Sequence, residues 1–169
     1  MIEPSPIQQF SISSFPTTTR VWIYQADRNL MPHEIQQCEQ LLQSFSKQWT
    51  AHQMPLKATT EIRFKRFIIF YVDESTTEIS GCGIDKSVNL MKQIQEQLGI
   101  DFFNRIQIAY KINDEIKTFL LSDAKKLFAE KLITADTIIF NNLVNTKHQL
   151  ETNWQQPLAD SWLWKRVSA

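Results

Sequence analysis

Cys82 lies between two of the chain's three glycines, directly before residues with helical spacing. Glycine suits positions where the backbone needs a positive φ or a close approach to another group. Free amides at the start of a helix bind anions and make a nearby thiol more reactive. The segment therefore predicts an anion- or small-ligand-binding loop formed by Ser80, Gly81, Cys82, Gly83, Asp85, Lys86 and Ser87. The alternative is a tight turn in which Asp85 or Ser87 only caps the helix.

A second group of polar residues can form the rim of that loop if the fold is ferredoxin-like. In that arrangement the loop after the first helix and the loop after the third strand lie at one end of the sheet. This brings Trp49 and His52 toward Asp73 and Glu74. Cys82 and His52 are then the catalytic candidates, as a nucleophile and its base. Solvated surface residues are the alternative for the histidine and for both carboxylates.

The other end of the same sheet carries a small basic cluster, formed by Arg28, Lys65 and Arg66. We interpret this cluster as a solvated rim rather than a binding patch. The three histidines share no helical or hairpin spacing, so we expect no metal site and no other cofactor. Chemistry is therefore expected at the Ser80–Ser87 end.

Composition narrows the class of protein further. The chain has 169 residues, a length that suits one domain. Its 18 Lys and Arg against 18 Asp and Glu argue against a nucleic-acid partner. It has no long apolar run and no basic, apolar leader, so we expect no membrane partner. Two cysteines make no disulfide framework, which predicts a cytoplasmic protein. Cys38 falls on the apolar stripe of a helix and is expected to be buried.

Periodicity predicts an α+β fold that begins with a ferredoxin-like β-α-β-β-α-β unit over about 20–112. Its elements are strands at 21–25, 58–64, 67–72 and 105–112, and helices at 32–49 and 84–98. The first and third strands are apolar on both faces, as the central strands of that fold are. A hairpin strand at 115–121, a helix at 122–132 and further helices extend the unit.

The domain organisation follows from the same pattern. Residues 1–19 contain three prolines and seven Ser or Thr, and we expect a flexible arm there, followed by one domain at 20–169. The open face of the sheet needs a cover, because a large exposed apolar patch is unusual in a monomer. We expect the C-terminal segment to supply it with Trp154, Trp162 and Trp164. A homodimer that uses this face is the alternative.

Four short segments carry a family resemblance: V-W-I-Y-Q at 21–25, K-Q-W-T-A-H at 47–52, V-D-E-S at 72–75 and S-G-C-G-I-D-K-S at 80–87. They resemble a family of short, uncharacterised bacterial proteins that often carry the label ABC transporter ATPase. The resemblance supplies no established catalytic residues. The label itself conflicts with the residues, because a P-loop needs G-x-x-x-x-G-K-[S/T] and here Asp85 precedes Lys86. We therefore expect no ATPase.

Three functions remain open. The first is a small-ligand or anion-binding domain at the Ser80–Ser87 segment, with or without catalysis. The second is a protein-interaction module that uses the Trp-rich C-terminal segment. The third is an RNA-binding module, since Trp22 and Tyr24 resemble the aromatic first strand of RNA-recognition domains. The run K-R-F-I-I-F-Y-V at 65–72 lacks the glycines of their third-strand motif, which places RNA last.

Overall fold

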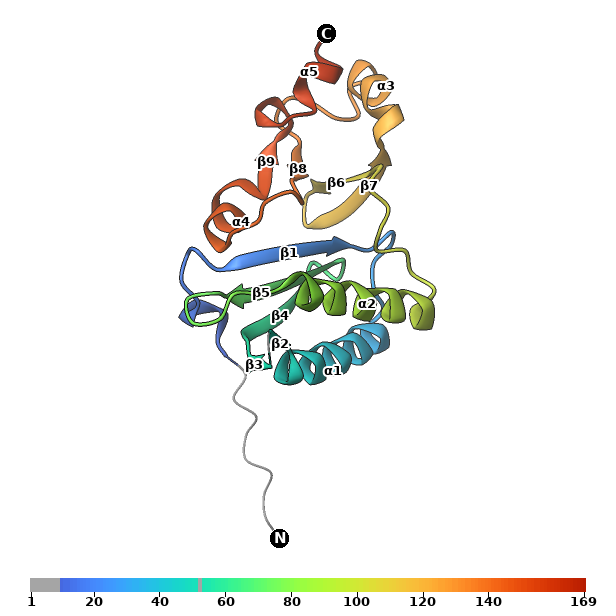
Figure 1. The fold of residues 1–169 in the computed structure, drawn as a ribbon. Helices are drawn as coiled ribbons and strands as arrows, with labels where there is room; N and C mark the ends of the chain where they lie inside the picture. The colour runs from blue at the N-terminus through green and yellow to red at the C-terminus, as the bar shows by residue number, and fades with distance from the viewer. Residues whose placement is uncertain (1–9, 52) are drawn as a thin grey trace.

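The computed structural model describes residues 10–51 and 53–169 and shows an α+β fold with two main antiparallel sheets (Figure 1). Five α-helices lie within these residues: α1 (Pro32–Gln48), α2 (Gly81–Leu98), α3 (Ala124–Ala129), α4 (Lys147–Asn153) and α5 (Trp164–Val167). The strands are β1 (Arg20–Gln25), β2 (Thr50–Ala51), β3 (Met54–Pro55), β4 (Lys57–Arg63), β5 (Phe67–Asp73), β6 (Gln107–Ile112), β7 (Glu115–Leu120), β8 (Ile138–Phe140) and β9 (Gln155–Pro157). Short 3-10 turns occur at Ile12–Ser14, Leu121–Asp123 and Leu158–Asp160.

The first sheet has the order β1-β5-β4, with every pair antiparallel. Its central strand, β5, is buried along all seven residues, as its unbroken apolar run predicted. Figure 1 shows α1 and α2 together on one face of this sheet. Ile68, Phe70 and Val72 point to that face, where they join the buried residues of the two helices, Cys38 and Met91 among them. The predicted burial of Cys38 is therefore confirmed.

The second sheet has the order β7-β6-β8-β9 and lies across the opposite face of the first (Figure 1). A second core between the two sheets contains Phe67, Ile69 and Tyr71 from β5, together with Phe140 and Trp154. A third core lies beyond it, where α3 and α5 cover the second sheet. The first sheet is thus covered on both faces, which explains why β5 has no polar face.

The ferredoxin-like order is not clearly shown, because its fourth strand is missing from the first sheet. β6 pairs with β7 through a turn in which Asn113 has a φ of 54°, and its other edge pairs with β8. Its link to β1 is the hydrogen bond from Gln25 Nε2 to the Gln107 carbonyl, at 3.2 Å. The outer edge of β1 instead meets Asn145 and Thr146. A short hairpin is the more local pairing, which costs less loop-closure entropy than a return to β1.

The expected arm is only partly described. Residues 1–9 lie outside the described part of the chain, and residues 10–19 pack on the first sheet instead of extending away from it. Phe15 is 2% exposed and belongs to the core between the sheets. The Lys147 side chain donates to the Phe15 carbonyl at 2.8 Å, and its backbone amide donates to Thr19. Burial of one aromatic ring and these hydrogen bonds offset the ordering of a segment without periodicity.

The predicted tryptophan cover is confirmed for one residue of three. Trp154 is fully buried against Phe67 and Phe140, with ring centroids 4.9 Å from each. Trp164 packs on Phe128 in the third core and so does not reach the first sheet. Trp162 is 46% exposed. The second sheet, which the sequence pattern did not predict as a layer, supplies the rest of the cover.

Candidate functional site

The predicted Ser80–Ser87 loop is the beginning of α2. Ser80 is the N-cap residue, and its hydroxyl accepts a hydrogen bond from the Gly83 amide at 3.1 Å. The expectation that Asp85 or Ser87 caps the helix is therefore wrong. Among the three glycines only Gly99, at the end of α2, has a positive φ, of 63°. Gly81 and Gly83 thus serve some purpose other than a left-handed turn.

Gly83 permits a close approach between three segments. A Cβ atom at this position would lie 2.9 Å from Ile79 Cγ1, closer than packed carbon atoms tolerate. On the carbonyl side, the Trp49 indole donates to the Gly83 oxygen at 2.9 Å. Trp49 is 2% exposed, so the indole is a buried support for the first turn of α2. The predicted proximity of Trp49 to this segment is confirmed.

Gly81 and Cys82 form the open part of the site. Both are exposed, and a Cβ at Gly81 would meet no atom within 4 Å. The Ser80 hydroxyl serves Gly83, and the Ile84 amide donates to the Ser80 carbonyl. Within the described residues, the amides of Gly81 and Cys82 therefore have no acceptor. Two backbone donors of an 18-residue helix face solvent beside a free thiol.

The two rim carboxylates hold the turn that leads into α2. Asp73 accepts from the Ser75 amide at 3.0 Å and pairs with Lys57 at 3.5 Å. Although burial opposes it, these partners lower the pKa of Asp73. Glu74 accepts from the Ile79 amide at 3.2 Å and pairs with Arg20 at 3.1 Å. Both carboxylates are engaged within the fold, so they position the site and do not face a ligand.

Of the remaining candidate site residues in the described part of the chain, two are exposed and one is buried. Asp85 and Lys86 are exposed on the second turn of α2. Ser87 is buried, and its hydroxyl donates to the Ile84 carbonyl at 2.6 Å. His52 lies outside the described residues, so its predicted pairing with Cys82 stays a prediction. The described residues assemble an open helix start but no catalytic pair.

The basic cluster at the other end of the sheet is a solvated rim for Arg28 and Lys65 but not for Arg66. Arg66 is 6% exposed, and its guanidinium donates to five acceptors at 2.8–3.5 Å. The acceptors are the Ala26, Asp27 and Ile116 carbonyls and the side chains of Asn29 and Thr118. Burial among these neutral groups lowers the pKa of Arg66. Arg28 is exposed and forms a two-pronged ion pair with Glu34, and Lys65 is exposed as well.

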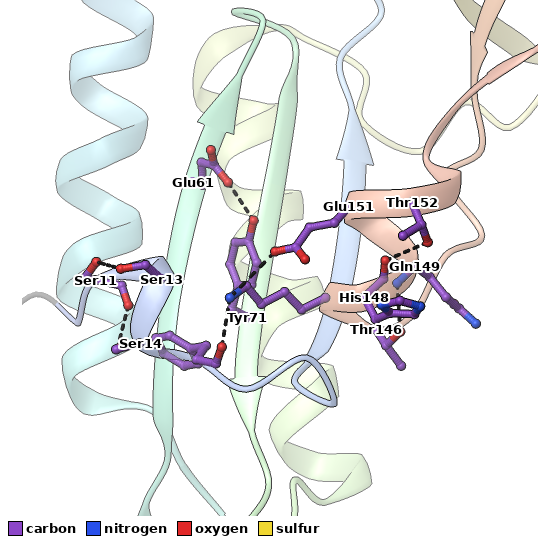
Figure 2. A network of polar contacts seen from close by, with 12 residues as sticks. Ser11, Ser13, Ser14, Glu61, Tyr71, Thr146, His148, Gln149, Glu151 and Thr152 are labelled. Carbon is purple, nitrogen blue, oxygen red and sulfur yellow. Dashed lines mark hydrogen bonds and ion pairs between the residues drawn. The ribbon is translucent and has the colours of Figure 1, made fainter.

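Figure 2 shows a polar network that no sequence pattern revealed. The Tyr71 hydroxyl donates to Glu61 at 2.6 Å. Arg63 binds the other oxygen of that carboxylate at 2.7 Å. Burial and the Glu61 charge raise the pKa of Tyr71. The Ser11–Ser14 turn lies nearby in Figure 2, and Lys147 donates to the carbonyl of Phe15, which follows that turn. The hydrogen bond from Lys147 to Phe15 fastens residues 10–19 to the fold, and the Glu61 carboxylate is already occupied by Tyr71 and Arg63.

The face expected to stack RNA bases is closed. Trp22 and Tyr24 point toward the helices, where Trp22 contacts Trp49 and Tyr24 contacts Phe70. The opposite face of β5 lies under the second sheet. Neither face presents the open aromatic platform on which RNA-recognition domains stack bases.

No helix in the described parts of the chain is long and apolar enough to cross a bilayer. Across residues 10–51 and 53–169, no group of three or more His, Cys, Asp or Glu side chains converges in a way that could hold a metal ion.

Comparisons with known proteins returned no matching family model, no matching curated protein and no matching solved structure. The resemblance to the bacterial family labelled ABC transporter ATPase therefore stays a prediction, and the site rests on its own geometry.

Proposed function

We propose that the chain is a binding domain for a small anionic ligand, recognised at the start of α2. The observation that supports it best is the pair of exposed amides at Gly81 and Cys82, which have no acceptor among the described residues. The partial positive charge at a helix start attracts anions, and α2 is long enough to develop it fully. Gly81 has no side chain, so an oxyanion can approach these amides without steric hindrance.

The surroundings support binding more than catalysis. Lys86 adds a positive charge one turn along the helix, and Asp85 beside it offsets that charge, so the amides have to provide most of the attraction. Trp49 and Ser80 fix the first turn from behind through the Gly83 carbonyl and amide. A rigid, preformed set of donors binds with a smaller entropy cost than a loop that must order first. The Cys82 thiol is then a neighbour of the ligand.

A proline substitution tests the role of the amides directly. Gly81→Pro removes the first donor, and proline is favoured at the first position of a helix. Ser80 is already extended, with a ψ of 165°, as the residue before a proline prefers. Titration of inorganic phosphate, followed by amide chemical shifts, should move Gly81 and Cys82 first. Gly81→Pro should weaken binding about tenfold, the scale of one hydrogen bond to a charged group.

Cys82→Ser is the matched control, because it keeps the backbone amide and changes only the thiol. We expect it to bind phosphate as the parent protein does. Unchanged chemical shifts at Gly81 and Cys82, or equal affinity for Gly81→Pro, would contradict the proposal. Loss of binding in Cys82→Ser alone would assign the site to the thiol instead.

We further infer that the first sheet is related to the ferredoxin-like unit. The order β1-β5-β4, with α1 and α2 on one face, is what that unit retains when its fourth strand is removed. An experimental structure tests this relation: a β6 paired with β1 would support the complete unit, and a β6 paired only with β7 and β8 would support the divergent form.

A protein-interaction function has one observation in its favour. Trp162 is 46% exposed, and the guanidinium carbon of Arg166 lies 5.8 Å from the centroid of its ring. Tryptophan is enriched among the residues that contribute most to binding at protein interfaces. Trp154 and Trp164 are used in the cores, so Trp162 is the residue to test. If a second copy binds there, sedimentation should show a dimer that Trp162→Ser abolishes.

A further inference from the structure

The outer side of β4 is an unpaired sheet edge. Its inner side pairs with β5 along all seven residues, and no described strand pairs with the other side. The remaining edge of this sheet is partly used, since the Val21 amide of β1 donates to the Asn145 carbonyl at 3.0 Å. In the second sheet, the Ile116 carbonyl of the edge strand β7 accepts from Arg66. An unpaired edge presents a row of amide and carbonyl groups that match another extended chain.

A hollow of about 220 Å³ follows this edge. It is lined by Glu39, Leu42 and Gln43 of α1 and by Thr60, Glu61 and Ile62 of β4. Successive residues of a strand point to opposite faces, so three consecutive lining residues place the hollow along the edge itself. Thr60 and Ile62 border it on the helix side, and Glu61 borders it on the side of Tyr71. The hollow is therefore where an added strand and its side chains would lie.

β4 lacks two of the devices that usually protect an edge from pairing, a proline and a bulge. Its sequence, Lys-Ala-Thr-Thr-Glu-Ile-Arg, contains no proline, and its register with β5 runs without a bulge. The charges at its two ends are engaged, since Lys57 pairs with Asp73 and Arg63 pairs with Glu61. In the middle of the strand, at the hollow, Thr60 and Ile62 carry no charge, and the Glu61 carboxylate is held by Arg63 and Tyr71.

The charge at the hollow indicates the chemistry of the partner. Glu39 is exposed there, and it forms no ion pair within the described residues. A lysine or arginine on an added strand would supply the missing cation. A second copy fits less well: in a symmetric antiparallel pair centred on Thr60, Lys57 would lie directly opposite Arg63 of the second copy, and like charges at opposed positions destabilise a sheet.

We propose that β4 binds an extended segment of a partner protein by strand addition, with a basic side chain of that segment placed in the hollow beside Glu39. The backbone of β4 supplies the hydrogen bonds, and the α1 side of the hollow selects the side chain. This surface lies between α1 and β4 and shares no residue with the start of α2. It is therefore independent of the anion site.

A fluorescent peptide of sequence acetyl-Val-Thr-Val-Lys-Val-Thr-amide tests the proposal on the full chain. Fluorescence anisotropy should show saturable binding, and amide exchange should slow in β4. Glu39→Lys should weaken binding about tenfold, because it replaces attraction with repulsion at the hollow. Glu96→Lys, an equal charge change at an exposed position of α2, is the matched control and should bind as the parent does.

Two further peptides separate strand addition from simple charge attraction. A version with N-methyl groups on alternate residues keeps the lysine but loses the amides that would face β4, and it should not bind. A version with glutamate in place of lysine should bind more weakly. No saturable binding, equal binding of the N-methylated peptide, or equal effects of Glu39→Lys and Glu96→Lys would overturn the proposal. A dimer of the peptide-free protein that protects β4 would assign the edge to a second copy and overturn it too.

Discussion

The two long helices begin in opposite ways. At the start of α1, Pro32 removes one amide donor, and the Glu34 carboxylate accepts from the Met31 amide at 2.8 Å. Arg28 then binds both oxygens of that carboxylate, at 2.9 Å and 2.8 Å. The partial positive charge of the helix start is thus neutralised within the protein.

At the start of α2, the first turn has no acidic residue, and two glycines occupy it. Ser80 binds one amide, and the donors of Gly81 and Cys82 remain exposed. Side chains of the protein therefore satisfy the partial positive charge at the start of α1, whereas the partial positive charge at the start of α2 faces the solvent. The comparison indicates that a helix start becomes available to a ligand when nearby side chains do not satisfy it first.

The cysteines give the largest expected difference between the two helices. Cys38 of α1 is fully buried, and burial together with Glu34 and Glu39 raises its pKa to about 11. Cys82 of α2 is exposed. Alkylation with iodoacetamide, followed by mass spectrometry, should modify Cys82 about a thousandfold faster, since Cys38 reacts only after local opening. Equal rates in the native protein would mean that α1 does not pack as described, and unfolding in urea should equalise them as a control.

The next largest expected effect follows from loss of the Glu34 carboxylate at the start of α1. We expect Glu34→Gln to lower the free energy of unfolding by about 2 kcal/mol, because Arg28 and the Met31 amide lose a charged acceptor. The Arg28 hydrogen bonds lower the pKa of Glu34 from 4.5 to about 2. Its contribution is therefore complete above pH 4.5 and is lost as the pH falls toward 2.

Urea unfolding at pH 7 and pH 3 measures the Glu34 effect, which should be larger at pH 7. Glu39→Gln, a nearby change on the same helix at a residue without an ion pair in the described structure, should leave stability unchanged within about 0.5 kcal/mol. A Glu34→Gln protein as stable as the parent at pH 7 would show that α1 does not depend on its closed start.

The two glycines of α2 should respond in opposite directions. Gly83→Ala should destabilise the protein by about 1–2 kcal/mol, because its Cβ would meet Ile79 and disturb the contact with Trp49. Gly81→Ala should stabilise it by about 0.5–1 kcal/mol, since its Cβ enters open space and alanine favours the helix. Thermal unfolding of both variants tests this pair. Two shifts of the same sign would argue against the described start of α2.

The smallest expected change in stability comes from a variant in which α2 begins like α1. Cys82→Asp adds a carboxylate to the first turn and should stabilise the protein by about 0.5 kcal/mol relative to Cys82→Ser. The gain should shrink in 1 M NaCl, which screens such interactions. The same change should abolish phosphate binding. Retained phosphate binding in Cys82→Asp would separate the anion site from the start of α2.

Local sequence patterns predicted the helices and strands in the first half of the chain, because the apolar spacing of each element depends only on the residues within it. The apolar spacing of α1 and the unbroken run of β5 are confirmed over nearly the predicted bounds. The hairpin partner of β6 was predicted at 115–121 and is confirmed as β7. The strand on the other edge of β6, which is β8 and not β1, was not predicted, because alternation shows which face is buried and says nothing about which strand lies alongside. The hairpin turn at Asn113 was the readable clue, and it leads to β7.

The sequence predicted where the candidate site lies, but it did not predict that the site is the first turn of a helix. Topology brought Trp49 toward the Ser80–Ser87 segment, and the hydrogen bond to Gly83 confirms that. The start of this helix was predicted three residues too late, at 84, because two glycines suggested a loop, although Ser80 three residues before Gly83 is the spacing of an N-cap. No sequence pattern could show that Arg66 is buried and hydrogen-bonded, because its acceptors come from separate segments of the chain.

The buried guanidinium of Arg66 also bears on how the protein is made. Ribosomes synthesise the β4–β5 hairpin well before residues 116 and 118, which supply two of its acceptors. Until those residues emerge, the first sheet carries a charged side chain that its own segments cannot fully satisfy, and uncovered apolar residues of β5 such as Phe67. A nascent chain in this condition is prone to misassociation. The first sheet therefore becomes stable only after the last third of the sequence has been synthesised. A chain truncated before that point should be a substrate for chaperones.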